Sequence, residues 1–230
     1  MMTSLDPQHQ VPLAPAPWQL TGSGYIVAIR LPDTTTDDAL FVPDSLQGTR
    51  KGRLAMMMFV DYTQSDVGPY HELLFIPGQF RFSDGYHRSI TRIFVSTWDS
   101  VVNGNINWGI PKDRCDFQVQ YGEREDVIAL RAEDGTTFAE LTFRPSRWPR
   151  LPTTTSLIPA RLRTLGQHRD GQQFLYTPSS KGHVKPAKLV SARFNPAYFP
   201  DLSQGKIVSC MKVTDFKMVF PLSHIEPIRG

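Results

Sequence analysis

Residues 127–143 read VIALRAEDGTTFAELTF and carry the clearest local signal in the chain. Two β-prone runs, residues 127–132 and 137–143, flank Glu133-Asp134-Gly135-Thr136. An Asp-Gly pair between two alternating runs supplies the positive φ angles that a tight turn between antiparallel strands needs. This stretch therefore predicts a β-hairpin, and with it an antiparallel sheet.

Other segments of the chain have the same β-prone character. Residues 25–31, 72–76 and 91–96 are short apolar runs between turn residues. Residues 54–60 form a continuous apolar run, which is consistent with a fully buried strand, although periodicity alone leaves a helix open. Residues 207–220 are too long for one regular strand and their alternation changes phase, which predicts a bulge or bend.

Helix signals are few and short. Residues 37–41 are stopped by Pro43, residues 97–103 are stopped by Gly104, and a third helix is expected after Pro196. Nineteen prolines and sixteen glycines divide the rest into strand-like pieces. The predicted fold class is α+β, mainly β: an antiparallel barrel or cone-like sheet with a few short helices.

The composition predicts a single domain. With 230 residues, 40% hydrophobic and 11% aromatic, the chain can bury a core without a metal or disulfide. We expect residues 1–17, which are polar and rich in proline and glutamine, to be a flexible arm, and residues 18–230 to be the domain. Residues 145–159 separate two strand-rich portions, neither of which is large enough to be an independent domain.

The charge and the cysteine content of the chain argue against several classes of function. A net charge of +3 comes from 25 basic and 22 acidic residues spread along the chain, so we expect no nucleic-acid partner. The chain has no apolar stretch of bilayer length and no secretory hydrophobic region, so we expect a cytoplasmic protein without a membrane partner. The six histidines do not have the spacing of metal ligands. Cys115 has no histidine partner in a recognisable nucleophile motif, and the two cysteines, Cys115 and Cys210, are too few for a disulfide framework.

One short segment points to specific chemistry. Asn107-Trp108-Gly109-Ile110-Pro111-Lys112-Asp113 places a lysine directly after a rigid turn, at the start of a predicted strand. A Pro-Lys pair after a glycine is ordinarily a solvated turn. Here it occurs in one chain with Asp38-Ala39-Leu40, Val42-Pro43, Gly68-Pro69-Tyr70-His71-Glu72, Pro200-Asp201-Leu202 and Ile207-Val208-Ser209. Because these segments occur together and in this order, the chain resembles the acetoacetate decarboxylase-like family from about residue 25 to residue 220.

The resemblance implies a chemistry that needs no metal or cofactor. Lys112 matches the lysine that forms a Schiff base with a keto acid, and Glu72 matches the acidic residue that faces it. A lysine attacks a carbonyl only when neutral, and with an ordinary pKa of roughly 10.4 about one molecule in 2,500 is neutral at pH 7. Burial in an apolar pocket can supply the roughly 4 to 5 kcal/mol that would bring such a pKa near 7.

The sequence departs from the family pattern beside the lysine. The second lysine of the family is Asp113 here, and an anion close to Lys112 would stabilise its cation. In an extended segment, neighbours point to opposite faces, so we expect Asp113 to point outward. Arg114 would then share the Lys112 side and contact the substrate.

Two further departures concern the pocket. The arginine that the family places before its first strand has no counterpart at residues 22–25, and the acidic residue expected near Ala55 is missing. Met56 and Met58 would make that wall apolar, which suits a larger or more apolar acyl group than acetoacetate. Methionines are more often core filler than pocket lining, so that alternative stays open.

The remaining candidates are Tyr70 and Trp108 as substrate-binding residues. Trp108 is equally a structural aromatic that fixes the turn, and Glu72 is equally a residue of a surface strand. We therefore expect a β-keto acid decarboxylase, a homo-oligomeric lyase of secondary metabolism acting on a small-molecule keto acid. The alternatives are an imine-dependent aldolase or dehydratase of the same superfamily, and a non-catalytic small-molecule binding barrel.

Overall fold

Two β-sheets make up most of the protein, whose computed structural model describes residues 11–228. The larger sheet runs in the order β7 (Lys112–Arg114), β6 (Arg92–Val95), β3 (Tyr70–Ile76), β2 (Leu54–Gln64), β1 (Trp18–Arg30), β15 (Lys206–Phe220), β14 (Ser179–Phe194), β10 (Thr137–Pro145), β9 (Asp126–Arg131) and β8 (Asp116–Tyr121), with β11 (Leu151–Thr154) paired to β14. The smaller sheet runs β16 (His224–Pro227), β13 (Gln172–Tyr176), β12 (Leu165–Arg169), β5 (Gly85–Arg88) and β4 (Gln79–Phe82).

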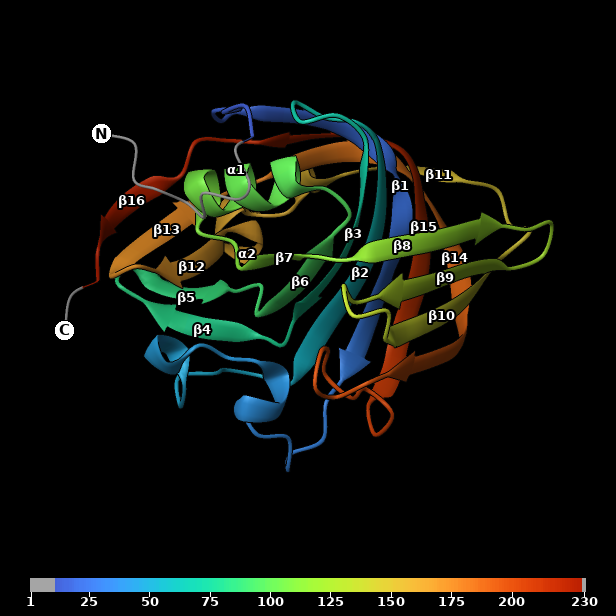
Figure 1. Cartoon of the computed structure of the whole chain (residues 1–230), viewed down its shortest axis with the longest axis horizontal. Coiled ribbons are helices and arrows are strands. Elements are labelled where there is room, and N and C mark those ends of the chain that lie inside the picture. The colour runs from blue at the N-terminus through green and yellow to red at the C-terminus, as the bar shows by residue number, and fades with distance from the viewer. Residues whose placement is uncertain (1–10, 229–230) are drawn as a thin grey trace.

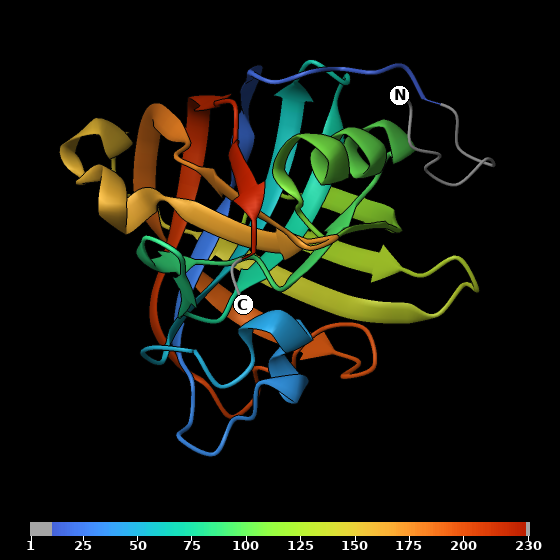
Figure 2. The same ribbon diagram turned by 90° about the vertical axis from the view of Figure 1, so that its left-hand side faces the viewer.

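The helices are short and lie at the margins of the sheets. They are α1 (Trp98–Trp108), α2 (Ala160–Arg163) and the single-turn segments η1 (Asp38–Leu40), η2 (Asp44–Leu46) and η3 (Thr155–Leu157). Figure 1 shows α1 above the smaller sheet, and Figure 2 shows that sheet in front of the strongly curved strands of the larger one. The α+β, mainly β class with a barrel-like antiparallel sheet is therefore confirmed.

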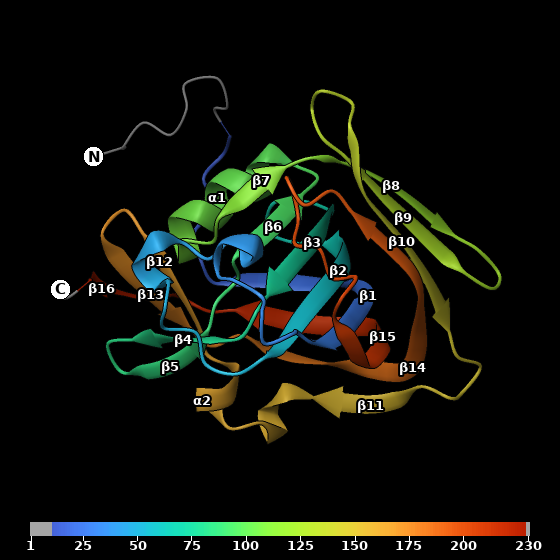
Figure 3. The same cartoon turned by 90° about the horizontal axis from the view of Figure 1, so that it is seen from below.

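The two faces of the larger sheet pack against different partners. Its ends curl so that β9 and β10 lie opposite β1, β2 and β3, as Figure 3 shows from below. On β2, Met57 and Phe59 enter the core enclosed by this curl. Met56 and Met58, one position away, face the second core, which the smaller sheet and α1 cover. This period of two is what a strand buried on both faces requires.

The predicted hairpin and the predicted bulge are both confirmed. β9 and β10 pair antiparallel, and Gly135 has the positive φ of 86° that the turn needs. In β15, the pairing with β1 and with β14 shifts register around Thr214 and Asp215, and Asp215 has a φ of 52°. An inserted residue of this kind changes the phase of side-chain alternation. The apolar run at residues 54–60 is a strand, as part of β2.

Two helix predictions need correction. The helix expected at residues 97–103 continues through Gly104 to Trp108, where Gly109 ends it with a φ of 63°. The helix expected after Pro196 is only a turn, in which the backbone N–H groups of Tyr198 and Phe199 both donate to Asn195 O. The segment at residues 37–41 is confined to the three residues of η1.

The predicted arm, residues 1–17, falls partly outside the described residues. Its described end lies along α1. The N–H of Ala14 donates to Asn103 Oδ1 at 2.7 Å, and Asn107 Nδ2 donates to Ala14 O at 2.8 Å. Flexibility of the whole arm stays a prediction. Within the part of the chain that the structure describes, no helix has the length and apolar character needed to cross a bilayer.

Candidate active site

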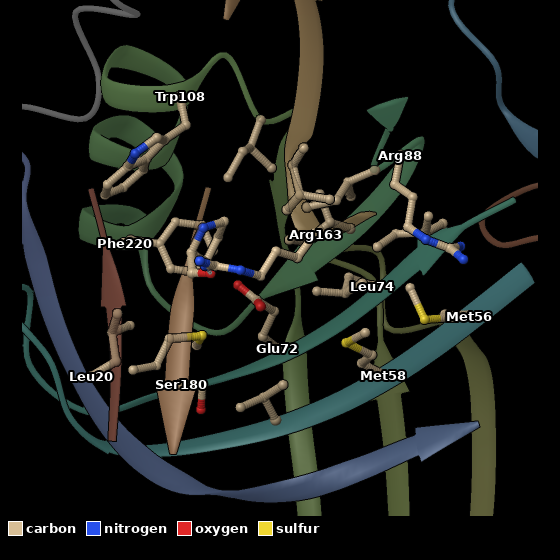
Figure 4. A pocket seen from close by; sticks show the side chains of 18 of the residues that line it. Leu20, Met56, Met58, Glu72, Leu74, Arg88, Trp108, Arg163, Ser180 and Phe220 are labelled. Carbon is tan, nitrogen blue, oxygen red and sulfur yellow. Dashed lines mark hydrogen bonds between the residues drawn. The ribbon is translucent and has the colours of Figure 1, made fainter. Parts of the chain in front are cut away.

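A cavity of about 520 Å³ lies between the larger sheet and the elements that cover it. Its walls are mostly apolar, as Figure 4 shows, and its charged lining residues are Glu72, Arg88, Lys112 and Arg163. Of the residues proposed from the sequence, six line this one cavity: Met56, Met58, Tyr70, Glu72, Trp108 and Lys112. The structure thus brings together side chains from β2, β3, α1 and β7.

Lys112 reaches the cavity because α1 ends at Trp108, four residues before it. Gly109 turns the chain out of the helix, and Ile110 and Pro111 lead into β7, where Lys112 pairs with Ile93 of β6. The Lys112 side chain is 4% exposed. Its Nζ lies 3.1 Å from Glu72 Oε2 and donates to Ser100 Oγ at 2.9 Å. The amine is therefore held between a carboxylate and a hydroxyl.

Gly104 of α1 makes room for this lysine. A Cβ at position 104 would stand 2.7 Å from Lys112 Cδ, closer than non-bonded carbon atoms approach. Ser100, one helical turn before Gly104, supplies the hydroxyl that accepts from Nζ. One face of α1 therefore both accommodates the lysine stem and orients its amine.

Glu72 is buried on β3 rather than exposed on a surface strand. Tyr62 of β2 donates its hydroxyl to Glu72 Oε1 at 3.2 Å. Burial first, and then the charge of Glu72, raises the pKa of both Tyr62 and Tyr70 well above the ordinary phenol value. Both phenols therefore stay protonated at neutral pH. The ring of Tyr70 lies 5.1 Å from Lys112 Nζ, within the range of a cation–π contact.

The two residues after Lys112 both lie outside the cavity. Asp113 is exposed and pairs with Arg92, which confirms its outward orientation. Arg114 is not among the residues that line the cavity, and its guanidinium pairs with Asp116. The register gives the reason: Ile93, paired with Lys112, lines the cavity, whereas Val95, paired with Arg114, lies beyond it.

The aromatic residue before the turn packs into the core and also borders the cavity. Trp108 is 1% exposed, its Nε1 donates to Pro221 O at 2.7 Å, and its ring meets Trp18 edge to face at 4.9 Å. These contacts fix the end of α1. The same residue also lines the cavity.

Sequence reasoning did not single out several residues that shape this site, among them Tyr62, Arg88, Ser100, Gly104 and Arg163. Tyr62 could have been predicted from the alternation of side chains along β2, because it lies on the same face of that strand as Met56 and Met58. The sequence around the other four residues contains no pattern that would place them at this site.

The sequence and structural comparisons differ in outcome. No protein-family model and no curated protein matches the sequence. Among solved structures, acetoacetate decarboxylase from Legionella pneumophila is 14% identical with a TM-score of 0.66, over 99% of this chain and 98% of the other. An acetoacetate decarboxylase-like enzyme from Sphingomonas wittichii RW1 is 10% identical with a TM-score of 0.65, over 93% and 94%.

A third similar structure is that of MppR, an enduracididine biosynthesis enzyme. It is 14% identical with a TM-score of 0.62, over 93% of this chain and 90% of the other. MppR is complexed there with the condensation product of pyruvate and imidazole 4-carboxaldehyde. At these identities the likeness concerns the fold. The chain has the acetoacetate decarboxylase-like fold over almost its whole length, as the sequence motifs predicted.

Proposed function

We propose that this protein is a lyase that decarboxylates a β-keto acid through a Schiff base on Lys112. The observation that carries the proposal is the position of Lys112 Nζ, buried at an apolar cavity, 3.1 Å from Glu72 Oε2 and 2.9 Å from Ser100 Oγ. An amine with a carboxylate beside it has a proton acceptor in reach. The three structural neighbours, all enzymes by their names, support an enzymatic role.

The first stage of the proposed reaction forms the imine. One proton passes from the ammonium of Lys112 to the carboxylate of Glu72, which leaves a neutral amine and a neutral acid. The amine attacks the keto carbon of the substrate, and the carbinolamine accepts the proton back and loses water. The product is a protonated imine beside a carboxylate, so the buried pair regains its original charges.

The second stage breaks the carbon–carbon bond. The electron pair of the bond to the substrate carboxylate moves into the protonated imine, CO2 leaves, and a neutral enamine remains. A proton taken up from solvent is then added to the enamine carbon, which forms the protonated imine again, and water hydrolyses this imine, which releases a ketone and restores the ammonium of Lys112. Glu72 holds and returns the proton, and the Tyr62 hydroxyl, which donates to Glu72 Oε1 at 3.2 Å, keeps that carboxyl group in position.

The walls of the cavity support a substrate larger than acetoacetate. Met58, Leu74 and Ile93 line the part of the cavity next to the Lys112 and Glu72 pair, and Met56 continues this apolar wall farther from the pair. An apolar chain attached to the keto carbon would remove this surface from water.

One alternative has its own support. MppR, with the same fold, is complexed with a condensation product of two carbonyl compounds. An aldolase or dehydratase would use the same imine and enamine on Lys112, with a second carbonyl compound in place of CO2 loss. The two functions differ in one product, because only the decarboxylase releases CO2.

The test combines trapping with product analysis. Borohydride is added to the protein with a panel of 2-keto and 3-keto acids, and intact mass, peptide mapping and CO2 are measured. We expect a reduced adduct on Lys112 and none on Lys212, which also pairs with a buried carboxylate, Asp126, but does not line the cavity. An adduct that persists in Lys112→Ala contradicts the assignment of the nucleophile. An absence of any adduct supports the non-catalytic binding barrel.

A further inference from the structure

Arg88 is a cation at the cavity with no hydrogen-bond or ion-pair partner among the described residues. It lies on β5, and its Nη1 is buried and makes no hydrogen bond within the described part of the chain. Burial also lowers the pKa of Arg88, because it removes water from around the charged guanidinium. A guanidinium nitrogen that is buried without a hydrogen-bond partner is costly, so its retention at a cavity points to an anionic partner supplied by a ligand.

Arg163 provides the contrast within the same cavity. Its Nη1 donates to Pro178 O at 2.6 Å and its Nε donates to Ile158 O at 3.3 Å. Its polar atoms thus hold the segment around α2 in place. Three basic side chains and one acidic side chain line the cavity, so the charge there favours an anionic occupant. Arg163 uses two of its donor groups on backbone carbonyls, whereas the Arg88 side chain makes no hydrogen bond to the described residues, so Arg88 is the arginine better placed to bind that occupant.

The position of Arg88 follows from the register of the sheets. Glu72, Leu74 and Ile76 of β3 face the cavity in succession, and four residues of strand span about 13 Å. Ile76 pairs with Met56, and Gln79, three residues further on, pairs with Arg88. Figure 4 accordingly shows Arg88 and Met56 on the far side of Leu74 from Glu72. Arg88 therefore lies at the end of the cavity remote from Lys112.

This separation excludes the carboxylate that is lost in the reaction. In a β-keto acid that group is two bonds from the keto carbon, which Lys112 would hold. We propose that Arg88 binds a second acidic group of the substrate, so that the substrate is an elongated keto acid whose apolar chain ends in a carboxylate. The inference rests on the proposed Schiff-base function for the reacting end and adds the recognition of the distal end.

The test uses methyl ketones that carry a terminal carboxylate beyond three, five or seven methylene groups, and the neutral amides of the same compounds. The readout is the concentration that gives half-maximal borohydride trapping. We expect the acid to be favoured over its amide by about tenfold or more at one chain length, as for a hydrogen bond to a charged group. Arg88→Gln should abolish this preference.

The matched control is Arg81→Gln, which removes the same charge from an exposed position on the neighbouring strand β4. It should keep the preference. Equal trapping of acid and amide in the parent, or a preference retained in Arg88→Gln, overturns the proposal. Thermal unfolding checks that both variants fold.

A failure of the Schiff-base function is distinguishable. If no ketone gives an adduct in the parent, binding of octanoate and octanamide is measured by calorimetry, which needs no imine. A preference for octanoate that disappears in Arg88→Gln supports the anion site by itself. A preference that survives in Arg88→Gln, or none in the parent, refutes it.

Discussion

Gly104 lies directly against Lys112: a Cβ at position 104 would stand 2.7 Å from Lys112 Cδ and 2.8 Å from Lys112 Cε. A glycine inside a helix costs about 1 kcal/mol relative to alanine. α1 thus carries a weak helix former at the point where the lysine stem crosses it. The contact ties the composition of the helix to the placement of the amine.

The first prediction is that Gly104→Ala slows imine formation without lowering the stability of the fold. The methyl group meets the far end of a flexible side chain, so Lys112 can move aside, but its Nζ then leaves Ser100 and Glu72. We expect imine trapping to slow by about 10-fold to 10²-fold, as for a small misplacement of a reacting group. The melting temperature should stay the same or rise, because alanine favours the helix. Ile106→Ala, at an exposed position of α1, is the control, and equal trapping in both variants would count against the contact.

The second prediction concerns proton transfer. Glu72→Gln keeps an oxygen that accepts from Tyr62 but cannot take up a proton, so we expect turnover to fall by about 10² or more. Tyr62→Phe, which leaves the carboxylate in place, should lower turnover less. Both are measured as CO2 release, with circular dichroism as the check on folding. An unchanged rate in Glu72→Gln would reduce Glu72 to a structural ion-pair partner.

The third prediction is that Asp113→Asn has almost no effect on the chemistry. Asp113 is exposed and pairs with Arg92, and exposed charges are screened by water and salt. We expect the pH profile of imine trapping to coincide in the parent and in Asp113→Asn. Loss of the exposed pair should cost at most about 1 kcal/mol of unfolding free energy. A profile displaced by about one pH unit toward acid, worth roughly 1.4 kcal/mol, would contradict the outward orientation.

The fourth prediction concerns alkaline stability. Burial raises the pKa of five tyrosines in the folded state: Tyr25, Tyr62, Tyr70, Tyr121 and Tyr176. In the unfolded chain these phenols lose their protons near pH 10. The folded state therefore binds more protons above that pH, and its stability is complete below pH about 10 and falls as the pH rises further. Each buried phenol should contribute a slope of up to about 1.4 kcal/mol per pH unit, and the half-exposed Tyr121 should contribute less because water screens its charge.

Urea unfolding at a series of pH values between about 9 and 11 measures this slope. Tyr176→Phe removes one of the five phenols and should make the decline with pH less steep than in the parent. Identical slopes in the two proteins would show that Tyr176 titrates alike in the folded and unfolded states.

Features that depend on one strand or one turn were readable from the sequence. Asp134-Gly135 predicted the hairpin because the tight turn of a β-hairpin needs residues, such as glycine, that adopt positive φ angles. Lys112 and Asp113 were placed on opposite faces because side chains of an extended segment alternate with a period of two. Met56 and Met58 were assigned to one apolar wall by comparison with the family pattern, and the alternation along β2 places both at the cavity. The Lys112 and Glu72 pair was expected only through the resemblance to a family.

Features that depend on how strands and helices meet were decided by the tertiary structure. Gly104 looked like a helix stop because low helix propensity is its only local signal, whereas its role is a contact with a lysine on another element. Arg114 lies two residues after Lys112, so alternation alone predicted that it shares the Lys112 face. The pairing of β7 with β6 places it beside Val95, beyond the end of the cavity. Arg88 is brought to the cavity by a second sheet, and no local pattern encodes which sheet closes over which face, because that choice follows from the packing of the whole core.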